Sequence, residues 1–210
     1  MGLIILLRDL GLLLLLNTVL VIMLYAVSRK PGYLVVGSLG VLLSGLAVGA
    51  VSAHARARFD VWLNPFADPT GKGWQILQGL SAMYAGGLWG AGIGAGAPQS
   101  VPIVSSDFIY AALAEELGII ACVLLVLIFV MLALRGWTIA AQARGPFGLL
   151  LGVGLTAMIT VQALLNVGGV VKAIPMTGIP LPFVSQGGSS LVAALVMVGL
   201  LAAISDGRRG

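Results

Sequence analysis

Acid–base chemistry in this chain must come from few side chains, because only 9% of the 210 residues are charged. Asp68 begins the run Asp68-Pro69-Thr70-Gly71-Lys72, which places a carboxylate close to a cation. A carboxylate can take the proton of a hydroxyl nucleophile, and a cation can stabilise a departing anion. The same run is also ordinary turn chemistry, because Asp-Pro and Thr-Gly favour tight turns. Taken alone, these residues favour the turn.

Other acidic and basic side chains are further candidates for contacts with an anionic substrate. Asp107 follows Ser105 and Ser106, so it is either a helix cap or part of a reaction cavity. Glu115 and Glu116 would lie about 100° apart on a helix, so one of them is expected to face a polar cavity or partner, and we take Glu115 as the candidate. The basic candidates for pyrophosphate or lipid head groups, each of which can equally be a solvated loop charge, are Arg56, Arg58, Lys72 and Lys172.

Several patterns typical of other chemistries fail on spacing. The glycines at 90, 92, 94 and 96 lack the dinucleotide-binding spacing, and Gly71-Lys72-Gly73 is not a P-loop, so both indicate turns and tight packing. His54 is the only histidine and has no companion ligands, so no protein-held metal site is predicted. The run near residue 187 has no base close to its serines, so nucleophilic catalysis is not indicated. We expect a closely packed helix start near a substrate, formed by Ser185, Gly187, Gly188, Ser189 and Ser190.

The elements that must position these residues are membrane helices. The chain is 60% hydrophobic and its mean hydropathy is +1.11, whereas soluble domains are about 45–50% apolar and about 25% charged. Thirty glycines suit a bundle in which helix backbones approach closely. The net charge of +4 is interpreted as a topology signal, and nucleic-acid binding is excluded.

A bilayer core needs about 20 mostly apolar residues per helix. By that measure the sequence predicts one all-α, polytopic membrane domain over residues 1–210, with about five transmembrane helices at 10–27, 33–53, 108–134, 147–169 and 188–205. Residues 54–106 form a large loop, in which residues 74–89 are predicted to make a short helix at the membrane interface.

Basic residues in the short loops predict the orientation. One side of the membrane should carry the turns after the first and third helices and the C-terminal end, which hold Arg29, Lys30, Arg135, Arg144, Arg208 and Arg209. The positive-inside rule makes that side cytoplasmic. The loop 54–106 and the segment 172–187 are therefore expected on the external face.

Ordered motifs along the chain resemble the SEDS family, which includes FtsW, RodA and SpoVE. The resemblance rests on Asp9-Leu10-Gly11 and on the segments 62–75, 86–94, 106–118 and 166–190, and it covers the C-terminal half of that family. This chain has Leu7-Arg8, Ser105-Ser106 and Gln186 where the family usually has Gln-Pro, His-Thr and Tyr.

The resemblance implies a multi-pass enzyme of the bacterial plasma membrane that polymerises lipid II during cell division or elongation. Such an inverting glycosyltransferase uses an undecaprenyl-pyrophosphate-linked glycan and works with a class B penicillin-binding protein. Asp68 matches the proposed catalytic aspartate, and with the resemblance catalysis outweighs the turn. A divalent cation, Mg or Mn, is a further expectation without a ligand cluster to support it.

The resemblance also leaves alternatives. The family has further transmembrane helices before this region, so the sequence is expected to be a fragment, a split protein or a degenerate homologue that is inactive alone. A lipid flippase or transporter is the rival class, because Gly/Pro-broken segments such as 175–188 also build transporter sites. An inactive interaction module is the third interpretation.

Overall fold

The protein is described by a computed structural model over residues 10–51, 53–96 and 106–207, which is helical throughout its regular elements. The membrane-length helices are α2 (Leu10–Ser28), α3 (Gly32–Val51), α6 (Ile109–Ala141), α7 (Gly145–Val170) and α8 (Gly188–Asp206). The segment between α3 and α6 holds α4 (Ala53–Leu63), the short 3-10 helix η1 (Pro65–Ala67) and α5 (Trp74–Gly86).

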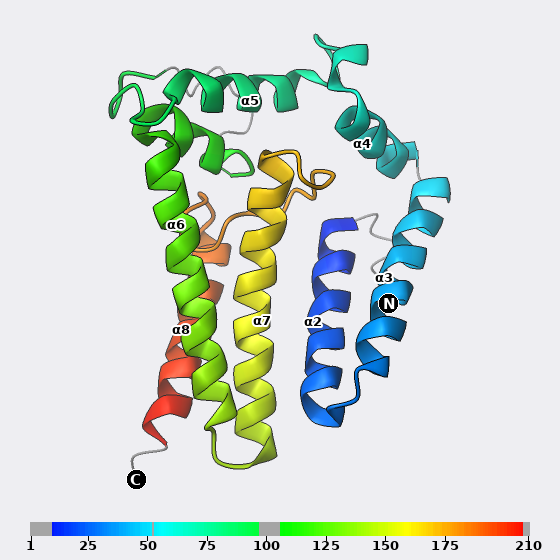
Figure 1. The fold of residues 1–210 in the computed structure, drawn as a ribbon, viewed down its shortest axis with the longest axis vertical. Helices are drawn as coiled ribbons and strands as arrows, with labels where there is room; N and C mark the ends of the chain where they lie inside the picture. Colours follow the sequence, from blue (N-terminus) through cyan, green and yellow to red (C-terminus); the bar gives the residue numbers. More distant parts are fainter. Residues whose placement is uncertain (1–9, 52, 97–105, 208–210) are drawn as a thin grey trace.

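The long helices run side by side, and the short ones lie across one end of them (Figure 1). Helix α7 is central, because it packs against both α2 and α6. The segment 171–187, which we call the signature loop, lies at the same end as α4 and α5. The turns that carry Arg29, Lys30 and Arg144 lie at the opposite end, as the alternation of helices predicts. Arg208 and Arg209 lie outside the described residues.

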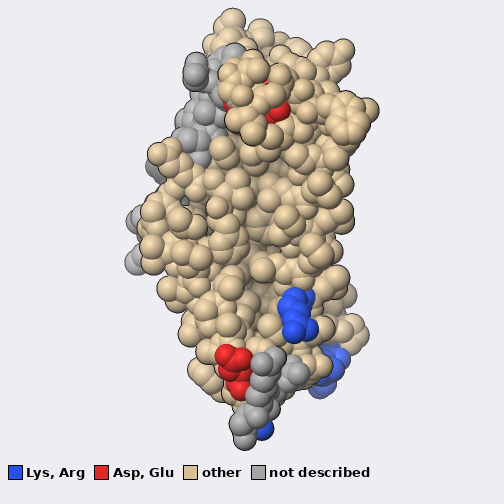
Figure 2. Space-filling view, turned by 90° about the vertical axis from the view of Figure 1, so that its left-hand side faces the viewer, with Lys and Arg blue, Asp and Glu red and all other residues tan. Residues whose placement is uncertain are grey.

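Four described helices are long and apolar enough to cross a membrane, at Gly11–Ser28, Ile109–Ala141, Gly145–Val170 and Gly188–Asp206. A shorter apolar helical stretch, Gly32–Leu43, lies in α3, where a fifth span was predicted. Figure 2 shows one face of the bundle, on which the described charged side chains lie towards the two ends and leave a broad uncharged band. This distribution is the one that a hydrocarbon core requires.

The large loop is more helical than the sequence predicted. Residues 54–106 were expected to contain one short helix, but α4, which begins just before this range at Ala53, also occupies it as far as Leu63. Its sequence alternates small and charged residues and has no apolar stripe, so periodicity could not reveal it. The predicted interfacial helix 74–89 is present as α5 and ends at Gly86, where Gly87 adopts a positive φ of 54°.

A break in α6 accommodates the glycine-rich segment that follows α5. Gly118 has φ 82° and ψ 171°, and a Cβ there would collide with the backbone of residues 88–90. The N–H of Ala91 donates to the carbonyl of Glu115 at 2.8 Å, and the N–H of Ile119 donates to the carbonyl of Gly87 at 3.0 Å. These bonds satisfy backbone groups that lose their partners inside the helix. The glycines therefore serve packing and turns, as the sequence predicted.

A hydrophobic cluster lies beneath the irregular segments and joins them to the bundle. Phe108, just before α6, and Leu181 of the signature loop are fully buried in this cluster, together with Ile76 of α5 and Val170 of α7. The ring of Phe108 occupies the space that a Cβ at Gly79 would need. Because side chains of α5 and of the signature loop pack in the same close-packed cluster, neither segment can move without disturbing the other.

Candidate active site

Asp68 lies in a tight turn between η1 and α5. Its Oδ1 accepts the N–H of Gly71 and its Oδ2 accepts the N–H of Lys72, both at 3.0 Å. A Cβ at Gly71 would collide with this carboxylate, so the close turn requires glycine there. The side chain is exposed, and each oxygen keeps a further lone pair for another donor. The predicted turn therefore exists, and it fixes the carboxylate that was predicted to be catalytic.

Lys72 connects the Asp68 turn to a larger cavity. Asp68 and Lys72 both line a small cavity of about 170 Å³ at the turn. Lys72 also lines a neighbouring cavity of about 480 Å³, which we call the polar cavity. The polar cavity is lined by Ala57, Arg58, Val61, Lys72, Gln75, Ile76, Asp107, Met176 and Gly178. It brings together three of the predicted substrate-binding residues, because Arg58 and Asp107 accompany Lys72.

Arg58 reaches from α4 to the signature loop. Its Nη1 donates to the carbonyl of Thr177 at 3.1 Å and to that of Met176 at 3.4 Å. A Cβ at Gly178 would lie 3.7 Å from Nη2 of Arg58 and 3.8 Å from Oδ2 of Asp107, so both charged groups lie close to this glycine. Gly178 has φ 75°, a conformation that glycine adopts readily.

Three further carbonyls of the signature loop accept hydrogen bonds from neighbouring side chains. Trp62 Nε1 of α4 donates to the carbonyl of Lys172 at 3.0 Å, and Gln162 Nε2 of α7 donates to that of Pro180 at 3.2 Å. Asn166 of α7 is buried, and its Nδ2 donates to the carbonyl of Ile179 at 2.8 Å. Side chains of two helices thus fix the path of a loop that has no regular structure.

The start of α6 is tied to the same loop. Asn166 Nδ2 also donates to the carbonyl of Asp107 at 3.2 Å. Ser185 is buried; its hydroxyl accepts the N–H of Leu181 at 2.7 Å and donates to the carbonyl of Ser106. Ser106 in turn donates its hydroxyl to Oδ1 of Asp107 at 3.1 Å. Ser185 therefore holds the loop against the segment that carries Asp107, and nothing in this arrangement gives it a base.

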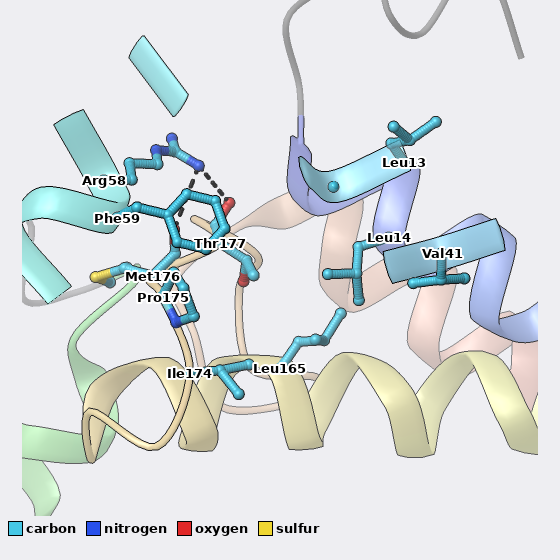
Figure 3. A pocket seen from close by; sticks show the side chains of 11 residues that line it. Leu13, Leu14, Val41, Arg58, Phe59, Leu165, Ile174, Pro175, Met176 and Thr177 are labelled. Carbon is cyan, nitrogen blue, oxygen red and sulfur yellow. Dashed lines mark hydrogen bonds between the residues drawn. The ribbon is translucent and has the colours of Figure 1, made fainter. Parts of the chain in front are cut away.

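An apolar groove of about 220 Å³ lies on the other side of Arg58 (Figure 3). It is lined by Leu13, Leu14, Val41, Gly45, Arg58, Phe59, Leu165, Ile174, Pro175, Met176 and Thr177. Arg58 and Met176 line both this groove and the polar cavity, so they form part of the wall between the two. The groove presents almost only hydrocarbon, while the polar cavity presents charge.

The remaining predicted substrate contacts are not part of the polar cavity lining. Lys172 has φ 61° and contributes its carbonyl to Trp62. Glu115 is buried on α6, with its side chain close to Gly96, and it is more deeply buried than Glu116. Arg56 is exposed on α4, as are Gly188 and Ser189 at the start of α8. The lining of the polar cavity includes none of Arg56, Glu115, Lys172, Ser185, Gly187, Gly188 and Ser189.

Sequence reasoning missed the residues that hold the signature loop. Trp62 and Gln162 each make one of the long-range side-chain bonds described above, and Asn166 makes two. A weak signal was present, because polar Gln162 and Asn166 interrupt an otherwise apolar membrane helix at a spacing of four residues, which places them on one face. Trp62 gave no comparable signal.

In the part of the chain that the structure describes, the acidic side chains do not form a cluster that could bind a metal ion. No group of three or more His, Cys, Asp or Glu side chains suited to a metal ion is found among the described residues. The fold and the site define a multi-pass helical membrane protein with a polar, cation-lined cavity under two irregular segments at one end of its helices.

Comparison with known proteins places the chain in a family. The FtsW/RodA/SpoVE family, described as cell cycle protein, matches residues 1–210, and the chain belongs to this family. Peptidoglycan glycosyltransferase RodA of Mycobacterium tuberculosis (strain ATCC 25618 / H37Rv) is 39% identical over 202 residues, which are 96% of this chain and 43% of the relative. Stage V sporulation protein E of Bacillus subtilis (strain 168) is 41% identical over 192 residues, which are 90% of this chain and 52% of the relative.

Two further matches agree. The probable peptidoglycan glycosyltransferase FtsW of Geobacter metallireducens is 38% identical over 206 residues, which are 97% of this chain and 55% of the relative. A solved structure on the structural coordination of polymerization and crosslinking by a peptidoglycan synthase complex matches with a TM-score of 0.79 and 27% identity, over 99% of this chain and 58% of the other. The chain thus spans about half the length of the curated relatives it matches.

Proposed function

We propose that this chain supplies the reaction site of a peptidoglycan glycosyltransferase that polymerises lipid II in the bacterial plasma membrane. The relatives named as glycosyltransferases support the reaction class. The observation that carries the proposal is that one turn carries Asp68, which lines the small cavity, and Lys72, which lines both the small cavity and the polar cavity. The turn orients a candidate base and a candidate cation together, which is what a displacement of pyrophosphate by a hydroxyl needs.

In the proposed reaction, Asp68 accepts the proton of the GlcNAc hydroxyl of the incoming disaccharide. The hydroxyl oxygen then forms a bond to the anomeric carbon of the growing glycan, with inversion, while the bond from that carbon to the pyrophosphate oxygen breaks. Undecaprenyl pyrophosphate leaves with the electron pair, and Lys72 stabilises its negative charge. Two backbone N–H groups hold Asp68 in place, so little reorganisation is needed when the proton moves.

Both irregular segments are proposed to lie on the external face, where the sugar groups of lipid II are presented. The basic turns at the opposite end favour the cytoplasm for that end. A class B penicillin-binding protein is the proposed partner, and it is supported by the match to a complex that coordinates polymerization with crosslinking.

Mg or Mn remains a proposed addition and has no step assigned to it. Magnesium sites often combine one or two carboxylates with substrate phosphates. Asp107 lines the polar cavity and is the carboxylate most suitably placed, but the described residues offer no fuller ligand set.

Substitution of Asp68 tests the proposal in an active protein that contains this chain. Asp68→Asn removes the proton acceptor and keeps the size of the side chain, so lipid II polymerisation should fall by at least about 10²-fold. Asp68→Ala should reduce it no further. Membrane levels of each variant are measured beside the glycan product. Near-normal polymer from a well-expressed Asp68→Asn protein would remove Asp68 from the reaction and leave Asp107 as the next candidate.

A further inference from the structure

The signature loop needs hydrogen-bond donors from outside itself. Pro175, Pro180 and Pro182 have no N–H and disfavour helix, so the loop cannot satisfy its own carbonyls as a helix does. Unpaired carbonyls are costly in a chain buried at the end of a membrane bundle. The donors that meet this need therefore also decide where the loop lies.

Helix α4 supplies donors to two separate points of the loop. Arg58 bonds the carbonyls of Met176 and Thr177, and Trp62 bonds the carbonyl of Lys172. Arg58 and Trp62 are four residues apart, so they project from one face of the helix, one turn apart. That face of α4 thus grips the loop at residue 172 and again at residues 176–177.

The position that Arg58 imposes extends to Asp107. Ile179 follows the gripped residues closely, and its carbonyl is held by Asn166. The same amide nitrogen of Asn166 binds the carbonyl of Asp107. A displacement of residues 176–178 would therefore disturb the carbonyl pair that Asn166 holds, and with it the start of α6.

We propose that Arg58 is a positioning residue, which clamps the signature loop and maintains the wall between the polar cavity and the apolar groove. Nη1 donates to both loop carbonyls, and the rigid planar guanidinium fixes the direction of these N–H groups, whereas an ammonium group on a flexible stem would not. The sequence predicted direct contact of Arg58 with pyrophosphate, and the experiment below distinguishes that role from the clamp. The activity part of its test rests on the proposed function, whereas the structural part does not.

Four variants test the clamp against a charge contact. Arg58→Lys keeps the charge and loses the planar fork, and Trp62→Phe loses the second grip without changing charge. Arg135→Lys and Trp137→Phe are matched controls at the opposite end of α6. Amide hydrogen exchange of peptides over residues 172–187 is measured in lipid nanodiscs, and kcat and KM for lipid II are measured in an active protein that contains this chain.

The clamp predicts that Arg58→Lys raises exchange of the loop about tenfold, as loss of a charge-assisted hydrogen bond would. Trp62→Phe should raise it about threefold, as loss of one neutral bond would. In both variants kcat should fall more than KM rises, and both controls should stay within about twofold of wild type.

Unchanged exchange in Arg58→Lys would overturn the proposal, and so would a rise in KM alone with exchange unchanged, which marks a substrate contact. If Arg58→Lys fails to accumulate, Trp62→Phe decides by the same exchange measurement. If Asp68→Asn leaves polymerisation near normal, the proposed function fails while the exchange result still judges the clamp.

Discussion

The Asp68 turn and the signature loop are both irregular segments at one end of the bundle, yet they are held in opposite ways. In the Asp68 turn, a side chain accepts N–H groups three and four residues further along the chain. In the signature loop, carbonyls accept from side chains as far away as Arg58, which is 119 residues from Thr177. One segment is organised by its own sequence, and the other by the assembled helices.

This difference separates the two proposed roles. A locally closed turn can present a reactive carboxylate with little dependence on the rest of the fold, and the Asp68 side chain is exposed. A loop held by side chains of two helices depends on the relative positions of those helices, and the loop lines the polar cavity through Met176 and Gly178. We therefore expect damage to the loop to spread through the site, and damage to the turn to stay local.

The largest effect is expected from Asn166→Leu. Leucine has a similar size, but the carbonyls of Asp107 and Ile179 lose their donor in a buried place. Each unsatisfied buried carbonyl costs about 1–3 kcal/mol, so the loss of the donor to two carbonyls should cost about 2–6 kcal/mol of stability. Thermal unfolding of the detergent-solubilised protein measures this loss.

Gln162→Leu is the control for that experiment. Gln162 lies one turn earlier on α7, is half-buried and donates to the carbonyl of Pro180 alone. It should lose about 1 kcal/mol. Equal losses in the two variants would show that Asn166 does not join the loop to α6 in the way we describe.

A smaller, local effect is expected from Gly71→Ala. The new Cβ would collide with the Asp68 carboxylate, so the side chain must leave its two N–H partners while keeping its charge. Stability should fall by about 1 kcal/mol, as for a lost cap. Polymerisation should fall about tenfold, because the carboxylate is misplaced but present.

Thr70→Ala, at an exposed neighbour of Gly71, should change neither quantity. Hydrogen exchange of residues 172–187 should also be unchanged in Gly71→Ala. Faster exchange there would contradict the independence of the two segments.

The contrast also explains what the sequence could predict. Hydropathy placed α7 and α8 within two residues of their observed ends, because each apolar run is bounded by turn residues. The span predicted to end at 134 continues as helix to Ala141, since Arg135 leaves the hydrocarbon but the backbone need not stop there. The Asp68 turn could be predicted from the sequence because the residues that bond to Asp68 are only three and four positions away.

The hydrogen bonds of Arg58 and Trp62 to the signature loop could not be predicted from the sequence. The carbonyls that these two side chains bond lie 110 or more residues away in the sequence. Helix α4, which carries both donors, has no regular spacing of apolar residues that would predict it. Arg58 was predicted as a pyrophosphate contact and it lines the polar cavity, but its bonds to carbonyls follow only from the assembled bundle.

The least perturbing test uses single cysteines to compare the two segments directly, in a Cys122→Ser background that removes the buried natural thiol. Thr70 is exposed in the Asp68 turn, whereas Thr177 is only 9% exposed under the Arg58 clamp. An impermeant maleimide added outside intact cells should label Thr70→Cys rapidly and Thr177→Cys slowly, because burial limits access although both lie at the same end.

Gln186→Cys, at an exposed position of the signature loop, should be labelled as readily as Thr70→Cys. Gln142→Cys, at the other end of the bundle, should stay unlabelled until the membrane is opened. Labelling of Gln142→Cys from outside would reverse the proposed orientation, and rapid labelling of Thr177→Cys would show that the signature loop is not held as firmly as its hydrogen bonds indicate.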